Sequence, residues 1–294
     1  MSQKQQKFSL SDPELTDDNY YSNEMNWKYC SASQYMDMVG GRPFLPSCEA
    51  RAMATLRGEY KPETTKAMLI GSILDCLWEL EDLDYSEKLQ IIGDRFPECL
   101  SSRGKTKNEL KSEYKLALKM YERTLQDPLF RQFMSGEKQK IFVGSISDVP
   151  FKIKIDSYIP DTAIVDLKTT QNTSMNHRKY VADSGNWETF YRGYDYVTQL
   201  AIYREIVRQN TGKTLRCFLA CIDKCDHPLP MIIELTPKSL DEALEVVKTK
   251  VPMVKMLKSG EVKNLCRCEE CDYCRDTYKC KVLSSEEFET QDER

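Results

Sequence analysis

The chain has 294 residues, 40% of them hydrophobic, which is enough for one large α/β domain with additions or for two small domains, and we expect one core with appendages. No run approaches the roughly 18 consecutive apolar residues of a membrane span, and the N-terminus lacks a signal peptide's apolar region, so we expect a soluble cytoplasmic protein with no membrane partner. The net charge of -4 excludes a chain that is basic overall, so any DNA site must be local.

The N-terminal part of the chain predicts a polar arm and two helices. Residues 1–25 are rich in Ser, Asp, Asn and Gln, so we expect a mobile or loosely packed arm that carries no chemistry. From Pro62 to Leu80, apolar residues recur at helical spacing, and Pro62 suits the first turn. Thr106 and Glu109 form a capping-box pattern, which predicts the start of the second helix.

The hydrophobic period then changes from helical to alternating. A helix is predicted from about Gly193 to Gln209, and a last helix begins after Pro237 and is interrupted near Pro252. These elements predict an α/β fold in which a central sheet is flanked by helices. The strand-like runs cover residues 138–143, 151–156, 163–168, 215–222 and 231–235.

Two of the strands carry acidic residues on their polar faces. Because side chains alternate along a strand, Lys152, Lys154 and Asp156 share one face of the first strand. Asp166 and Lys168 share one face of the second. If the two strands pair through the short turn between them, two carboxylates and an ammonium group converge.

Such a set suits phosphodiester hydrolysis. Carboxylates hold one or two Mg²⁺ (or Mn²⁺) ions that polarise the phosphate, and Lys168 orients the attacking water or stabilises the developing charge. The alternative is that Asp156 and Asp166 cap strand ends while Lys168 is a solvated charge.

The following helix adds Gln199 and Tyr203, one turn apart on one face. With Asp156, Asp166 and Lys168, these residues match in order the motifs of PD-(D/E)XK nucleases. The chain resembles the RecE and phage-recombination exonuclease type from about residue 20 to residue 274. The resemblance implies a restriction-endonuclease-like α/β core with a central mixed sheet.

The same resemblance assigns roles to individual residues. It implies that Asp156 and Asp166 bind metal, that Lys168 is catalytic, and that Gln199 and Tyr203 contact the DNA strand near the scissile phosphate. Ordinary helix packing is the alternative for the last two. Leu167 offers its backbone carbonyl to the metal.

Two further assignments concern metal and phosphate contacts. Where many RecE-like enzymes have a histidine ligand, Asp75 stands four residues after Gly71, and a carboxylate is a reasonable Mg²⁺ ligand. An exposed or capped acid is the alternative for Asp75. Lys152 and Lys154 are candidate phosphate contacts, with solvated surface charges as the alternative.

The C-terminal segment is rich in cysteine. Cys268, Cys271 and Cys274 have the spacing of three cluster ligands in bacterial ferredoxins and need a fourth ligand. Related nucleases of the AddB type join an N-terminal cysteine to three C-terminal ones around a 4Fe-4S cluster, which favours Cys48. Their usual spacing would select Cys280 in place of Cys268, but we expect Cys268, Cys271 and Cys274 to be the ligands, with Cys280 as the alternative. A structural Zn²⁺ and unligated thiols are the alternatives.

The resemblance also suggests an organisation and a function. We expect a nuclease domain with an N-terminal helical part over residues 26–265, a cluster-binding segment over 266–280, and an acidic tail over 281–294. The resemblance implies a phage-encoded exonuclease that resects linear double-stranded DNA 5′ to 3′, as a ring-shaped homo-oligomer working with a RecT-type annealing protein. A catalytically weak DNA-end-binding protein, or an Fe-S or zinc protein without nuclease activity, is the alternative.

Overall fold

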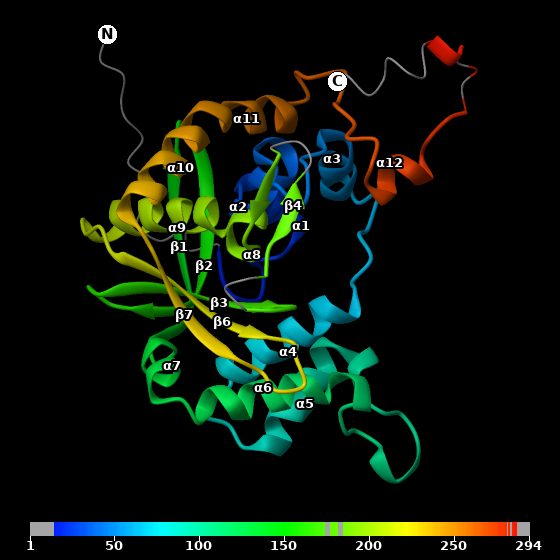
Figure 1. Ribbon diagram of the computed structural model, residues 1–294. Helices are drawn as coiled ribbons and strands as arrows, with labels where there is room; N and C mark the ends of the chain where they lie inside the picture. Colours follow the sequence, from blue (N-terminus) through cyan, green and yellow to red (C-terminus); the bar gives the residue numbers. More distant parts are fainter. Residues whose placement is uncertain (1–14, 174–176, 182–184, 281, 283, 287–294) are drawn as a thin grey trace.

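The computed structural model contains a five-stranded mixed sheet with helices on both faces (Figure 1). It describes residues 15–173, 177–181, 185–280, 282 and 284–286. Strands β3 and β6 pair in parallel, and the other neighbouring strands pair antiparallel. A separate hairpin joins β4 (Lys179–Val181) to β5 (Asn186–Glu188). The sheet order is β1 (Glu137–Ile146), β2 (Val149–Ile159), β3 (Ala163–Thr170), β6 (Arg216–Asp223) and β7 (Pro230–Leu235).

Alternation along β6 divides the core between the two faces. Cys217 and Leu219 pack into one cluster, whereas Phe218 and Ala220 pack into the other. The first cluster contains α2 (Ala32–Tyr35), α3 (Glu49–Arg57), α9 (Tyr196–Thr211), α10 (Pro237–Lys250) and α11 (Pro252–Ser259). The second contains α4 (Lys66–Glu79), α5 (Tyr85–Arg95), α6 (Lys115–Leu125) and α7 (Pro128–Phe133).

Short elements complete the chain. They are α1 (Asn23–Lys28), α8 (Phe190–Gly193), α12 (Asp272–Asp276), a π turn at Met36–Gly40, and 3₁₀ turns at Pro97–Cys99, Gly104–Thr106 and Ser112–Tyr114. No helix in the part of the chain that the structure describes is long and apolar enough to cross a membrane.

The predicted strands are confirmed; β1 and β2 extend beyond both predicted ends, and β3 begins as predicted but runs on to Thr170. Helix α9 ends at Thr211, and the next residue, Gly212, caps it with a left-handed φ of 74° that a side chain would strain. The last helix is interrupted at Pro252, as predicted.

Both predicted N-terminal helix starts are wrong. Helix α4 begins at Lys66 rather than near Pro62, because the Thr65 hydroxyl accepts a hydrogen bond from the Met68 N–H at 3.3 Å. Thr106 and Glu109 form no cap: Thr106 ends a 3₁₀ turn, and the helix that follows begins at Lys115.

The prediction that residues 1–25 form a mobile or loosely packed arm is wrong for the second half of this segment. Tyr20 and Met25 are buried, and Met25 packs against Val143 of β1. This segment covers the polar face of β2, whose lysines need partners once the sheet buries them. Residues 1–14 and most of the acidic tail lie outside the described residues.

Candidate active site

Asp156 and Asp166 meet where β2 and β3 separate. The two strands pair from Ile159↔Ala163 to Ser157↔Val165, and the ladder between them stops there. Just beyond it, the Leu167 N–H donates to Asp156 Oδ2 at 2.7 Å. The carboxylate therefore replaces the missing ladder partner and holds the two strands in a fixed relation at the point of separation.

Lys168 and Gln199 bind the two oxygens of Asp166, which is only 2% exposed. The Lys168 ammonium lies 2.5 Å from Asp166 Oδ2, and the Gln199 amide donates to Asp166 Oδ1 at 3.0 Å. The same amide donates to the Tyr203 hydroxyl at 3.2 Å. Helix α9 thereby positions Asp166, as the spacing of Gln199 and Tyr203 on one helical face allows.

Asp75 joins this cluster from α4. Gln139 of β1 donates to Asp75 Oδ1 at 3.3 Å and to Asp156 Oδ1 at 3.4 Å. Helix α4 lies close to β3 at Gly71, which has no side chain: a Cβ at this position would lie 3.0 Å from Thr169 Oγ1. We call Asp75, Asp156, Asp166, Lys168 and Gln199 the acidic site.

The acidic site holds more negative charge than its surroundings stabilise. Burial, reinforced by the charges of Asp75 and Asp166, raises the pKa of Asp156 well above its usual range. Burial also raises the pKa of Asp75, to about 6. Although burial lowers the pKa of Lys168, the carboxylates of Asp166 and Asp156 outweigh it and raise that pKa, so the lysine stays charged.

This donor set fits a hard divalent cation. Asp75, Asp156 and Asp166 lie close enough for their charges to act on one another, and among the described residues the buried Asp166 Oδ2 has no hydrogen-bond donor beyond its contact with the Lys168 ammonium. Oxygen ligands of this kind suit Mg²⁺ or Mn²⁺, and a cation would relieve the repulsion that raises the pKa of Asp156. Leu167 is placed beside Asp156, and its carbonyl stays a predicted ligand.

The prediction that Lys152 contacts DNA is wrong. Its side chain is 1% exposed, and its ammonium donates to Asn26 Oδ1 at 2.8 Å and to the Tyr20 carbonyl. Lys154 is also largely covered, with an ion pair of 2.9 Å to Asp17. Alternation correctly places both lysines on the Asp156 face, but the N-terminal segment covers that face.

In this conformation, the prediction that Tyr203 contacts DNA directly is wrong. It is 8% exposed and lies in the core cluster beneath α9, so only its hydroxyl reaches the acidic site, through Gln199. We assign it to positioning Gln199. Gln199 itself is half-buried and stays a candidate contact to DNA.

Gln139 and Tyr20 were missed by the sequence analysis. Gln139 has a left-handed φ of 50°, which is uncommon for a glutamine and places its amide between two carboxylates. Tyr20 is buried, and the charge of Asp156 contributes to the raised pKa that burial gives its hydroxyl. Residue type alone marked neither one, and the only signal was the aromatic pair Tyr20-Tyr21 inside a polar segment.

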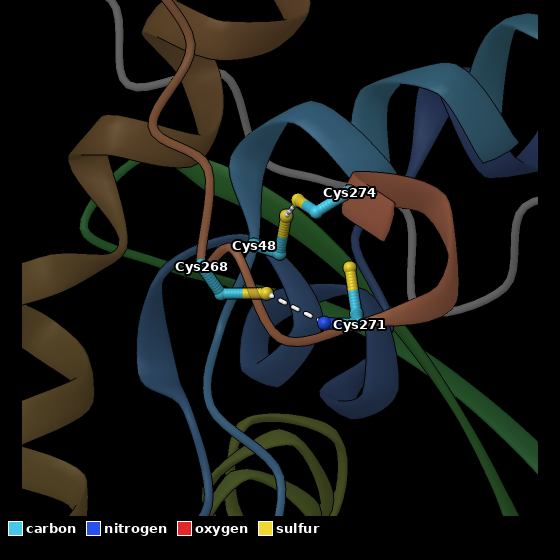
Figure 2. Close-up of side chains that lie close together, drawn as sticks. All are labelled: Cys48, Cys268, Cys271 and Cys274. Carbon is cyan, nitrogen blue, oxygen red and sulfur yellow. Dashed lines mark hydrogen bonds between the residues drawn. The ribbon is translucent and has the colours of Figure 1, made fainter. Parts of the chain in front are cut away.

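Four cysteine side chains form a second cluster, separate from the acidic site (Figure 2). The sulfurs of Cys48, Cys268, Cys271 and Cys274 all lie within 4.8 Å of one another and could hold a metal ion. We call these four residues the sulfur group. Cys280 is exposed and does not belong to it, so the structure brings together the preferred set from the sequence.

Comparisons with known proteins agree with this architecture. The model of a family described as "PDDEXK-like domain of unknown function (DUF3799)" matches residues 31–277. The crystal structure of a candidate exonuclease from Eubacterium rectale is 38% identical, with a TM-score of 0.84 over 95% of this chain and 99% of that chain. The crystal structure of SSO0001 is 13% identical, with a TM-score of only 0.26 over 69% of this chain and 83% of that chain. No curated protein matches significantly.

Proposed function

This chain belongs to the family of PDDEXK-like domains of unknown function (DUF3799), and from that premise we propose that it is a Mg²⁺-dependent exonuclease of linear double-stranded DNA. The observation that carries the proposal is the convergence of Asp75, Asp156 and Asp166 around Lys168. The 38% identity to a candidate exonuclease over nearly the whole chain supports it.

Each residue of the acidic site has a role in this reaction. Asp75, Asp156 and Asp166 would hold the metal, which supplies charge neutralisation at the phosphate and favours ionisation of water. Lys168, kept charged by Asp166 and Asp156, stabilises the negative charge that develops on the phosphate. Gln199 orients Asp166 through its amide, and Gln139 keeps Asp75 and Asp156 together.

A row of aromatic side chains supports a path for a DNA strand that leads away from the acidic site. The Lys168 ammonium lies 4.9 Å from the Tyr196 ring centroid. Tyr196 stacks on Tyr194 with their ring centroids 5.9 Å apart, and Tyr194 contacts Phe44 edge-on with ring centroids 5.3 Å apart. Lys179 of the β4–β5 hairpin lies over Phe44 at 5.0 Å. Aromatic faces beside a cation accept bases of any sequence, as an exonuclease requires.

The finer parts of the proposal follow from the family resemblance. The protein would resect DNA from 5′ to 3′ in phage-type recombination. It would act on DNA ends as a ring-shaped homo-oligomer and pass the resulting single strand to a RecT-type annealing protein. Duplexes labelled at the 5′ or the 3′ end test the direction, because 5′-to-3′ digestion releases a 5′ label first.

The test compares linear with covalently closed circular duplex DNA, each with and without Mg²⁺. We expect digestion of the linear form only, and only with Mg²⁺, and its loss in Asp166→Asn. The matched control is Asp161→Asn in the exposed β2–β3 turn, which removes a carboxylate outside the acidic site. Binding of linear DNA without digestion by the parent chain would instead favour an end-binding protein.

A further inference from the structure

The sulfur group joins two parts of the chain that are more than 200 positions apart in sequence. Cys48 immediately precedes α3, whereas Cys268 and Cys271 lie in the segment that leads into α12 and Cys274 lies within α12 (Figure 2). The Cys48 and Cys274 sulfurs are 3.5 Å apart, and both residues are almost fully buried. Such proximity of four thiols, in a region without a large apolar core, needs a bound group to account for it.

A 4Fe-4S cluster, which the AddB-type resemblance implies, does not fit this spacing. In a cubane each cysteine binds a different iron, which spreads the four sulfurs to roughly 6 Å from one another. Here no two of the four sulfurs are more than 4.8 Å apart. The cavity between them is therefore too small for four irons and four sulfides.

A single tetrahedral ion does fit. With Zn–S bonds of about 2.3 Å, four thiolates at tetrahedral angles lie about 3.8 Å apart. The Cys48–Cys274 separation of 3.5 Å and the upper limit of 4.8 Å bracket that value. Four thiolates that surround one ion leave no open position, which is the arrangement of structural rather than catalytic zinc sites.

The backbone around the sulfur group is arranged to support thiolates. The Arg51 N–H donates to Cys48 Sγ at 3.5 Å, and the Cys271 N–H donates to Cys268 Sγ at 3.4 Å. Donors of this kind stabilise the ionised sulfur and fix its direction. Two further bonds hold the C-terminal segment on α3: Ala50 N–H to the Cys266 carbonyl at 3.0 Å, and Cys266 N–H to Glu49 Oε2 at 2.9 Å.

We infer that Cys48, Cys268, Cys271 and Cys274 bind one Zn²⁺ ion that fastens the C-terminal segment to α3. The site is independent of the proposed nuclease activity, because none of its four residues belongs to the acidic site. Cys280 and Cys266, both exposed, are not ligands.

The test is elemental analysis of protein produced with both iron and zinc in the medium and purified without oxygen, so that a cluster would survive. We expect one zinc per chain, no acid-labile sulfide and no broad visible absorption. The zinc should be lost in Cys271→Ser and kept in the matched controls Cys266→Ser and Cys280→Ser.

A second measurement does not depend on the folding of a variant. The parent chain is loaded with Co²⁺, and the intense red-region bands of a tetrahedral thiolate site are expected. Four irons with sulfide, one iron without sulfide, or no metal in the parent chain overturns the inference. Retention of zinc in a folded Cys271→Ser together with its loss in Cys280→Ser overturns the ligand set.

Discussion

The acidic site and the sulfur group differ in how the chain assembles them. Asp156, Asp166 and Lys168 come from two neighbouring strands, and Asp75 and Gln199 are added by helices on either side. The sulfur group instead joins α3 to the C-terminal segment. The acidic site keeps repelling carboxylates together inside a rigid core, whereas the sulfur group closes a long loop.

The difference has an energetic consequence. Burial and mutual repulsion raise the pKa values of Asp75 and Asp156, so without a cation the acidic site reduces the stability of the fold. Four thiolates around one ion do the opposite, because the folded chain alone brings them together. We therefore expect activity to be the main readout of substitutions in the acidic site, and stability to be the main readout of substitutions in the sulfur group.

Among the variants that test this difference between the two sites, Lys168→Ala is expected to have the largest effect, and the effect is on activity. Removing the ammonium takes away the charge that opposes the developing phosphate anion, so digestion of linear duplex DNA should slow by at least about a hundredfold. Because the buried Asp166 carboxylate also loses its ion-pair partner, the melting temperature should fall in metal-free buffer, and the two rates are compared at a temperature at which both proteins are folded. The control is Lys213→Ala, which removes a surface ion pair with Asp161. Equal rates for Lys168→Ala and the parent would remove Lys168 from the mechanism.

Next in size is the effect of Cys48→Ser on stability. Loss of one of four thiolates should lower the free energy of unfolding by about 2 kcal/mol or more, seen as a drop in melting temperature of roughly 5 °C or more. Cys99→Ser is the control, because Cys99 is equally buried but lies outside the sulfur group. If both variants melt alike, the sulfur group contributes no more than an ordinary buried cysteine.

A smaller effect is expected in the pH dependence of the metal-free acidic site. The pKa of Asp75 is about 6 in the folded chain against an ordinary 3.8, so the folded state binds more protons than the unfolded state between these values. Stability from this group is therefore present at low pH and is lost as pH rises through about 6.

Asp75→Asn should remove this loss, with a gain on the order of 1 kcal/mol at pH 7 that disappears near pH 4. Urea unfolding of both proteins in Mg²⁺-free buffer measures the difference, and because the sulfur group is the same in both, its own titration cancels. A gain that is constant with pH would show that Asp75 is not perturbed.

Local patterns predicted the strands and much of the acidic site. The alternation in β2 and β3 placed Asp156, Asp166 and Lys168 on the correct faces, and the one-turn spacing placed Gln199 beside Tyr203. The burial of Lys152 could not be predicted, because a strand's alternation does not say which distant segment covers its polar face. The left-handed backbone of Gln139 had no sequence signal, since tertiary contacts impose it.

The central claim is that the three carboxylates of the acidic site form one divalent-cation site, and Mn²⁺ titration followed by calorimetry tests it most directly. Mn²⁺ prefers carboxylates to thiolates, so the sulfur group should not contribute. We predict that the parent chain and Asp161→Asn bind Mn²⁺ alike, and that Asp166→Asn loses at least about tenfold in affinity. Equal Mn²⁺ binding by Asp166→Asn and the parent would contradict the claim.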